Sequence, residues 1–137
     1  LHGELQNLID ELGVGERVKL LGTDKNPFKF IKNAECFLCA SRFEGFSNVL
    51  LEALACERFI ISTDHKSGAR ELLGDDEYGI LTPVDDEKAM EAAMRRALED
   101  ENLRQDYEKR AYGRVVKFDK NAVAAQLIGY LEGENGE

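Results

Sequence analysis

The sequence predicts an α/β fold, a parallel sheet flanked by helices, because segments with strand and helix patterns alternate along the chain. The strand segments are short apolar runs bounded by polar or glycine-containing turns, and the helix segments carry apolar residues every three or four positions. The chain has 137 residues, which suffices for one domain with a sizeable core. No internal repeat or low-complexity linker divides it.

The first part of the chain contains two expected helices and two expected strands. A helix over residues 4–12 has an apolar face and ends at Gly13, since glycine commonly follows a helix. A strand over residues 18–21, a short helix over 27–33 and a buried strand over 36–40 follow. The apolar face of the first helix consists of Leu5, Leu8, Ile9 and Leu12.

A polar turn then leads into an apolar helix over residues 48–56, and Ser47 or Asn48 is suited to cap its first turn. The alternation continues with a strand rich in β-branched residues, a short helix and a last strand. These three segments are residues 59–63, 69–73 and 79–82.

The last third of the chain is predicted to be helical. A helix over residues 86–98 begins with acidic residues, which the helix dipole favours in a first turn. A second helix covers about 102–116, and a third covers about 121–131 with Asp119 as its cap.

The formal charge of −9 is concentrated in the second half of the chain. Residues 1–70 hold nine Lys and Arg against ten Asp and Glu, whereas residues 71–137 hold nine against seventeen. A nucleic-acid site needs an excess of positive charge, so this balance argues against a nucleic-acid partner. No apolar stretch approaches the roughly 20 residues of a bilayer span, and no signal-peptide pattern is present, so we expect a soluble, cytoplasmic protein.

Three cysteines without a secretory context favour reduced thiols, in keeping with that location. Cys36 and Cys39 match a C-x-x-C spacing, but residues three apart on a strand point to opposite faces. Since no second cysteine pair or histidine cluster accompanies them, we assign both to core packing and expect no metal site.

The most informative segment, residues 41–56, joins an expected strand to the helix that follows. A helix N-terminus at the carboxyl end of a parallel strand offers free backbone N–H groups and a partial positive charge, which favour phosphate. Glu44 lies in the turn before this helix, and Glu52 lies about two helical turns further on, at roughly 1.5 Å rise per residue. A phosphate between two carboxylates suggests a sugar nucleotide, because its hydroxyls can donate to carboxylates on both sides of the diphosphate.

This segment resembles the E-x7-E signature of retaining GT-B glycosyltransferases of the group 1 family, family 4 in the usual classification. The signature is Glu44-x7-Glu52, within the string EGFSNVLLEALAC. A second string of similar proteins, S-T-D-x-x-S-G-x-R-E followed by a hydrophobic residue, occurs at residues 62–72. Two matched strings in order are more specific than either alone. The resemblance extends to residues 17–22 and 79–85, and so covers nearly the whole chain.

The resemblance implies a Rossmann-like parallel sheet, the C-terminal half of a GT-B fold, and roles for the two glutamates. In similar proteins the first glutamate contacts hydroxyls of the donor sugar, which makes Glu44 the candidate catalytic residue, as a group that positions the sugar. The second glutamate accepts hydrogen bonds from the ribose, and this role falls to Glu52. A structural salt bridge is the alternative for a carboxylate in this apolar helix.

Backbone N–H groups at the start of the helix are expected to contact the diphosphate and sugar. Gly45 is expected to allow a backbone conformation or an approach that a Cβ would block, or to be an ordinary turn glycine. The Ser47 side chain, where many relatives have glycine, either tunes donor choice or caps the helix. The N–H groups in question belong to Phe46, Ser47, Asn48 and Val49.

Two further places border the expected cleft. Gly22 and Thr23 follow a strand end at which family members often hold the nucleotide base. Residues 64–71 form a second strand-to-helix turn, and ligands of open α/β sheets bind at the carboxyl ends of the strands. Within this turn Lys66 and Arg70 either assist phosphate or acceptor, or form a salt bridge, which we favour.

Two features carry no assigned role in binding. His65 is an isolated histidine near the cleft, and we do not assign it as a catalytic base because relatives hold the acceptor-side groups in another domain. Residues 57–59, Glu-Arg-Phe, stand where Gly-x-Pro is usual, at the far end of the signature helix. This departure affects the expected local backbone shape more than donor binding.

From the resemblance we expect residues 1–132 to be a nucleotide-sugar-binding domain without its first strands, followed by a frayed tail at 133–137. The donor is expected to be a UDP-sugar, and the reaction a retaining transfer of a hexosyl or N-acetylhexosaminyl group without a metal cofactor. Acceptors of similar proteins are saccharides or lipid-linked sugars, which implies peripheral association of the whole enzyme with the inner face of the cytoplasmic membrane.

A complete GT-B enzyme also has an acceptor domain, and its donor domain begins with a strand and a loop whose Arg and Lys grip the diphosphate. Neither is found in this sequence, so we expect a piece of a longer protein that is inactive alone and has an exposed sheet edge. The main alternative is a noncatalytic nucleotide-binding α/β regulatory module, which would share the alternation but not the paired glutamates. A phosphorylase-like or sucrose-synthase-like protein is a second alternative, and the lysine that pyridoxal phosphate would need is not evident.

Overall fold

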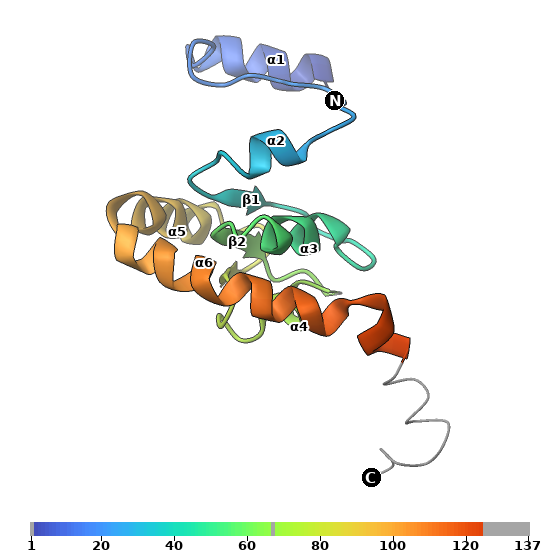
Figure 1. Cartoon of the computed structure of the whole chain (residues 1–137). Helices are drawn as coiled ribbons and strands as arrows, with labels where there is room; N and C mark the ends of the chain where they lie inside the picture. Colours follow the sequence, from blue (N-terminus) through green and yellow to red (C-terminus); the bar gives the residue numbers. More distant parts are fainter. Residues whose placement is uncertain (1, 67, 125–137) are drawn as a thin grey trace.

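The computed structural model describes residues 2–66 and 68–124 as a parallel sheet with helices on both faces (Figure 1). The strands, in spatial order, are β1 (Phe37–Cys39), β2 (Ile60–Thr63) and β3 (Ile80–Thr82). Leu38 is paired with Ile61 across the first ladder, and Ser62 with Leu81 across the second. The predicted parallel α/β architecture is confirmed.

The helices follow the predicted pattern, with ends that differ by a few residues. A further helical stretch begins at Lys120, where the N–H of Asn121 donates to the Asp119 carboxylate at 2.9 Å, as predicted. The rest of the helix expected over 121–131 and the tail at 133–137 lie outside the described residues. The helices are α1 (His2–Glu11), α2 (Phe28–Ile31), α3 (Asn48–Ala55), α4 (Ala69–Leu73), α5 (Glu87–Glu99), α6 (Glu101–Val115) and the 3-10 helix η1 (Val116–Phe118).

The sheet separates two hydrophobic clusters. On one face, side chains of α3, α4 and α6 pack around Cys39 and Ile60. On the other, α5 packs against Ile61, together with Tyr107 of α6. Every residue of β2 is buried, as expected for a central parallel strand covered on both faces. Cys36 packs against the second cluster while Cys39 lies in the first, so their predicted packing on opposite faces is confirmed.

Residues 18–21 do not form the predicted strand. Val18 and Leu21 are 42% and 61% exposed. A strand needs a neighbour to accept and donate its backbone hydrogen bonds, and the sheet of the described residues places no strand beside this segment. The far edge of β1 is likewise unpaired there, with Leu38 41% exposed, which agrees with the expected open edge.

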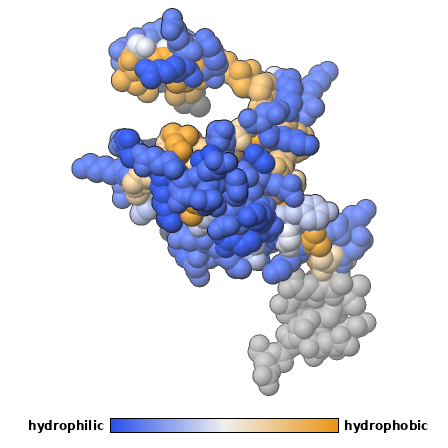
Figure 2. Space-filling view, turned by 60° about the vertical axis from the view of Figure 1, so that its left-hand side comes forward, coloured by the Kyte–Doolittle hydropathy of each residue, from blue (hydrophilic) through white to orange (hydrophobic). Residues whose placement is uncertain are grey.

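α1 forms as predicted, but only Ile9 on its apolar face is buried. Figure 1 shows α1 set apart from the sheet, and Figure 2 shows hydrophobic side chains along this helix and the segment that follows it. The amphipathic pattern therefore predicted α1 correctly. The described residues leave most of the apolar face of α1 exposed. None of the helices in residues 2–66 and 68–124 has the length and apolar character required to cross a bilayer.

α3 ends at a left-handed residue that is not glycine. Glu57 has φ 55°, its N–H donates to Leu54 O at 2.9 Å, and the N–H of Arg58 donates to Ala53 O at 3.1 Å. These are the hydrogen bonds with which helices commonly end at a glycine. The departure from Gly-x-Pro at residues 57–59 thus preserves this helix ending at the expense of backbone strain at Glu57.

Gly79→Ala should destabilise the fold, because a Cβ at Gly79 would lie 2.9 Å from the Ile60 carbonyl oxygen and 3.1 Å from Leu73 Cδ2. We expect the free energy of unfolding to fall by about 1–3 kcal/mol in urea denaturation. Gly113→Ala is the matched control, since a Cβ there would meet nothing within 4 Å and alanine favours the interior of α6 by up to about 1 kcal/mol. Equal effects of the two substitutions would contradict the packing around Gly79.

Candidate functional site

The turns that follow β1 and β2 meet at one edge of the sheet and are joined by hydrogen bonds and close packing. The Thr63 hydroxyl, at the end of β2, donates to the backbone carbonyl of Ser41, just after β1. The same hydroxyl lies 3.4 Å from the Cys39 carbonyl. The position of the first turn is therefore tied to the register of the sheet.

Gly68 makes the second contact between these turns. It has φ 88°, and a Cβ there would lie 3.1 Å from the Ser47 nitrogen and 3.3 Å from the Gly45 carbonyl oxygen. Gly45 itself has no positive φ, and a Cβ there would meet nothing within 4 Å in the unliganded chain. Of the expectations for Gly45, the special backbone conformation is wrong, while the approach of a ligand and the ordinary turn glycine stay open, and the glycine that the contact between these turns requires is Gly68.

Glu44 is fixed by two serine hydroxyls. Ser41 Oγ donates to Glu44 Oε1 at 2.6 Å, and Ser47 Oγ donates to Glu44 Oε2 at 2.9 Å. Ser47 occupies the N-cap position of α3 and is fully buried, yet no side chain caps this helix. The predicted cap by Ser47 or Asn48 is wrong, because the Ser47 hydroxyl bonds to an ionised carboxylate, which is a stronger acceptor.

These contacts keep the Glu44 carboxylate ionised. The hydrogen bond from Ser41 contributes most to lowering the pKa of Glu44 below its ordinary value, and the bond from Ser47 adds to it. Partial burial opposes the shift, while His65 nearby favours the charged form. An ionised carboxylate is an acceptor only, which suits it to bind hydroxyl groups.

The N-terminus of α3 retains backbone donors. No described residue accepts a hydrogen bond from the N–H groups of Phe46, Ser47 or Val49. The N–H of Asn48 is used within the turn, donating to Phe46 O at 3.0 Å, so only part of the predicted set is available in this conformation. The remaining donors and the helix dipole favour an anion here.

A cavity of about 290 Å³ brings Glu52 together with the loop before α2. Gly22, predicted to lie near the nucleotide base, and Val49 of α3 line it, whereas Thr23 does not. Its other lining residues are mostly apolar or aromatic, and among them Phe30 could not be found from motif spacing because it lies in a short helix without a signature. The remaining lining residues are Leu21, Asp24, Pro27, Ile31 and Phe37.

The second turn holds an ion-pair network. The Arg70 guanidinium pairs with Asp64 and Asp75, so the salt bridge favoured for Arg70 is confirmed. Lys66 is exposed to solvent. His65 is 2% exposed, and neither ring nitrogen has a hydrogen-bond partner.

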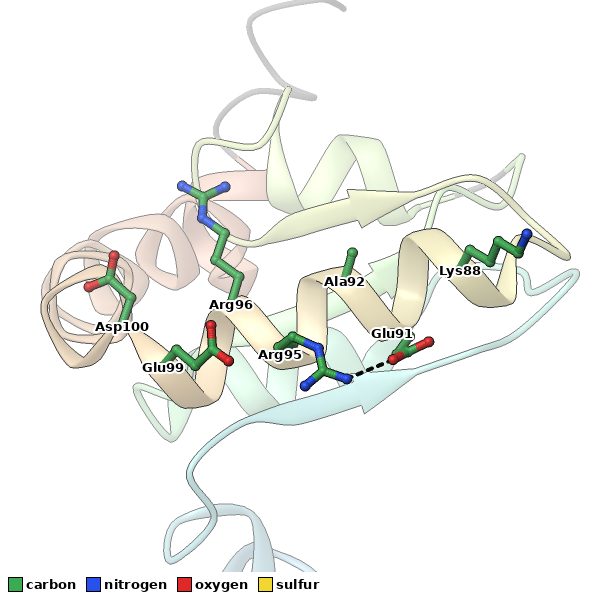
Figure 3. Close-up of a pocket in the computed structure, with 7 residues that line it drawn as sticks. All are labelled: Lys88, Glu91, Ala92, Arg95, Arg96, Glu99 and Asp100. Atoms are coloured by element: carbon green, nitrogen blue, oxygen red, sulfur yellow. Dashed lines mark hydrogen bonds and ion pairs between the residues drawn. The ribbon is translucent and has the colours of Figure 1, made fainter.

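A broader hollow of about 760 Å³ follows the outer side of α5 and the residue after it. Figure 3 shows charged side chains of both signs along this surface, including the pair between Glu91 and Arg95 at 2.8 Å. None of the predicted donor-binding residues lines it. The described residues likewise contain no cluster of three or more His, Cys, Asp and Glu side chains that could hold a metal ion.

Several solved structures share this fold. An Anabaena protein, Alr3699/HepE in complex with UDP, superposes with a TM-score of 0.85 at 23% identity, covering 96% of this chain and 36% of that one. Sucrose-phosphate synthase from Thermosynechococcus elongatus superposes with a TM-score of 0.81 at 27% identity, covering 95% of this chain and 33% of that one.

Two sequence relatives are named N-acetylgalactosaminyltransferases. The chain is 50% identical over 133 residues to the N-acetylgalactosamine-N,N'-diacetylbacillosaminyl-diphospho-undecaprenol 4-alpha-N-acetylgalactosaminyltransferase of Campylobacter jejuni, covering 97% of this chain and 36% of that protein. A second N-acetylgalactosaminyltransferase of that organism, named for a GalNAc-containing diNAcBac-PP-undecaprenol, is 32% identical, with 93% and 35% covered. The chain thus spans about a third of the length of these relatives. Residues 2–114 match the family described as "Glycosyl transferases group 1", and the chain belongs to this family.

Proposed function

We propose that the chain is the donor-binding domain of a retaining glycosyltransferase that takes a UDP-sugar, with UDP-N-acetylgalactosamine as the first candidate. The observation that carries this proposal is the placement of Glu44 and Glu52 on either side of the free N-terminus of α3. The UDP in the Anabaena complex and the names of the Campylobacter jejuni relatives support the choice of nucleotide and sugar.

The proposed donor lies across the start of α3. Its base and ribose occupy the cavity lined by Gly22, Phe30 and Glu52, where an aromatic ring offers a stacking surface and a carboxylate accepts from the ribose hydroxyls. The diphosphate lies at the N-terminus of α3, and the sugar lies beside Glu44. Glu52 lies four residues after Asn48, the first residue of α3, which corresponds to roughly 6 Å of rise along the helix axis.

In this arrangement the chain stabilises the leaving diphosphate with fixed backbone dipoles at the N-terminus of α3, an instance of electrostatic preorganisation. Glu44 orients the sugar through its hydroxyls and is held ionised by Ser41 and Ser47. The acceptor, a saccharide or lipid-linked sugar, is bound by the remainder of the longer protein at the inner face of the cytoplasmic membrane. A noncatalytic regulatory module is disfavoured because the similarity to named transferases extends through the whole signature segment.

Glu52→Gln and Glu44→Gln should have different effects on ligand binding. Glu52→Gln should weaken UDP and UDP-sugar together by about 1–3 kcal/mol, because a charge-assisted bond to the ribose is lost. Glu44→Gln should weaken only the UDP-sugar. Calorimetric titrations of the 137-residue chain with UDP and a panel of UDP-sugars measure both effects.

Glu91→Gln is the control for this pair, since it changes a glutamate on the outer side of α5 and should leave both affinities unchanged. Thermal melts exclude folding damage. If Glu44→Gln and Glu52→Gln reduced the affinities for UDP and UDP-sugar equally, or if neither variant reduced them, the separate roles assigned to Glu44 and Glu52 would be wrong.

Nucleotide binding should not depend on a divalent metal, because the helix N-terminus supplies the positive potential for the diphosphate. The affinity for UDP should stay within about twofold when EDTA replaces Mg²⁺ or Mn²⁺ in the titration. An affinity that disappears in EDTA and returns with Mn²⁺ would rule out a metal-independent phosphate site.

Ser47→Ala should raise the pKa of Glu44 toward its ordinary value of 4.5, because the hydrogen bond from the Ser47 hydroxyl is lost. The folded-state pKa of Glu44 lies below 4.5, so this carboxylate stabilises the fold above that pH and the contribution disappears as pH falls through the folded-state value. An NMR titration of the Glu44 carboxyl carbon between about pH 2.5 and 6.5, roughly two pH units on either side of the ordinary value, measures the shift. Ser62→Ala, at another fully buried serine that donates to Thr63 O, should leave the pKa unchanged.

A further inference from the structure

His65 is a buried polar side chain without a partner. It is 2% exposed, and neither Nδ1 nor Nε2 has a hydrogen-bond partner among residues 2–66 and 68–124. Burying two polar nitrogens without partners costs free energy that a leucine or methionine of similar size would not cost. The contacts of the described residues therefore give no reason for a histidine at this position.

The location of His65 connects it with the candidate site. Two residues before it, Thr63 donates to Ser41 O, and three residues after it, Gly68 packs against the Ser47 nitrogen. Both contacts are made with the turn that carries Glu44. The imidazole is thus enclosed where the two turns meet.

The chemistry of the ring indicates what kind of group could satisfy it. A neutral imidazole has one N–H donor and one acceptor nitrogen. A phosphate oxygen only accepts, whereas a sugar hydroxyl both donates and accepts. Hydroxyl groups of a bound sugar can therefore satisfy both nitrogens, and a diphosphate can satisfy only one.

We propose that His65 is a hydrogen-bonding residue of the donor-sugar site, and that its ring nitrogens find their partners in hydroxyl groups of the sugar bound beside Glu44. This inference rests on the proposed function. Because the ring is only 2% exposed, sugar hydroxyls reach it in this proposal when the two turns separate slightly at the contact between Gly68 and Ser47. His65 then distinguishes the nucleotide-sugar from the free nucleotide.

The imidazole resonances of the native chain test this directly. The sequence has two histidines, His2 and His65, so His2 on α1 is an internal reference. Long-range ¹H–¹⁵N NMR spectra are recorded without ligand, with UDP and with UDP-N-acetylgalactosamine, each at a concentration that calorimetry shows to be saturating. We expect the His65 nitrogens to shift with the UDP-sugar and not with UDP, while those of His2 stay unchanged.

The other outcomes are decisive too. A UDP-sugar that binds without moving the His65 nitrogens, or a shift that UDP alone reproduces, would overturn the sugar contact and leave the proposed function intact. If neither UDP nor any UDP-sugar of a panel bound, the proposed function would fail, and this inference with it.

Substitution separates a role in binding from a role in folding. His65→Leu should weaken the UDP-sugar by roughly threefold to tenfold for each hydrogen bond lost, with UDP affinity maintained and a melting temperature at least as high as that of the native chain. His65→Gln keeps a donor and an acceptor and should recover part of the loss, and His2→Gln is the matched control without effect. A lower melting temperature in both His65 variants, with equal losses for UDP and UDP-sugar, would mean that His65 is structural and would overturn the proposal.

Discussion

The contact between the turns after β1 and β2 is the constraint on which the candidate site depends. Thr63 fixes the first turn through Ser41 O, and Gly68 permits a backbone approach that any side chain would obstruct. Both contacts arise at the ends of adjacent parallel strands, so the register of the sheet determines where α3 begins. Donors at the N-terminus of α3 and the carboxylate of Glu44 are consequently held by the sheet rather than by the loops alone.

The parts of the structure that the sequence predicted are those encoded locally. Hydrophobic periodicity predicted α3 and α5. The family resemblance assigned Gly22 to the nucleotide base and Glu52 to the ribose, and the structure has both residues lining one cavity. The strand expected over 18–21 is absent because pairing depends on a neighbour that periodicity does not reveal. The same limit explains why the bond from Ser47 to Glu44 was missed, since a capping residue and a carboxylate partner have the same local sequence signature.

The features that departed from expectation lie at the two ends of α3 and in the turn beside it. Glu57, just after α3, adopts a left-handed backbone conformation. Ser47, at the N-cap position of α3, donates its hydroxyl to the Glu44 carboxylate and does not cap the helix. His65 adds a buried ring without partners. The backbone strain at Glu57 and the unsatisfied ring of His65 each reduce the stability of the fold, by about 1 kcal/mol or more. The cost at His65 falls on the candidate donor site, as is common where binding limits the choice of residues.

A chain of charge −9 that binds a nucleoside diphosphate needs a local source of positive potential. Arg70 in the turn beside α3 supplies little of it, because its guanidinium is paired with Asp64 and Asp75. The backbone of α3 is different, since its N-terminal dipole acts within one turn and cannot be neutralised by a change of pH. Most of the excess acidic charge lies beyond residue 70, and solvent ions at physiological strength screen charges separated by more than about 8 Å. An acidic chain and an anionic donor are therefore compatible, provided that the diphosphate contacts the first turn of α3 directly.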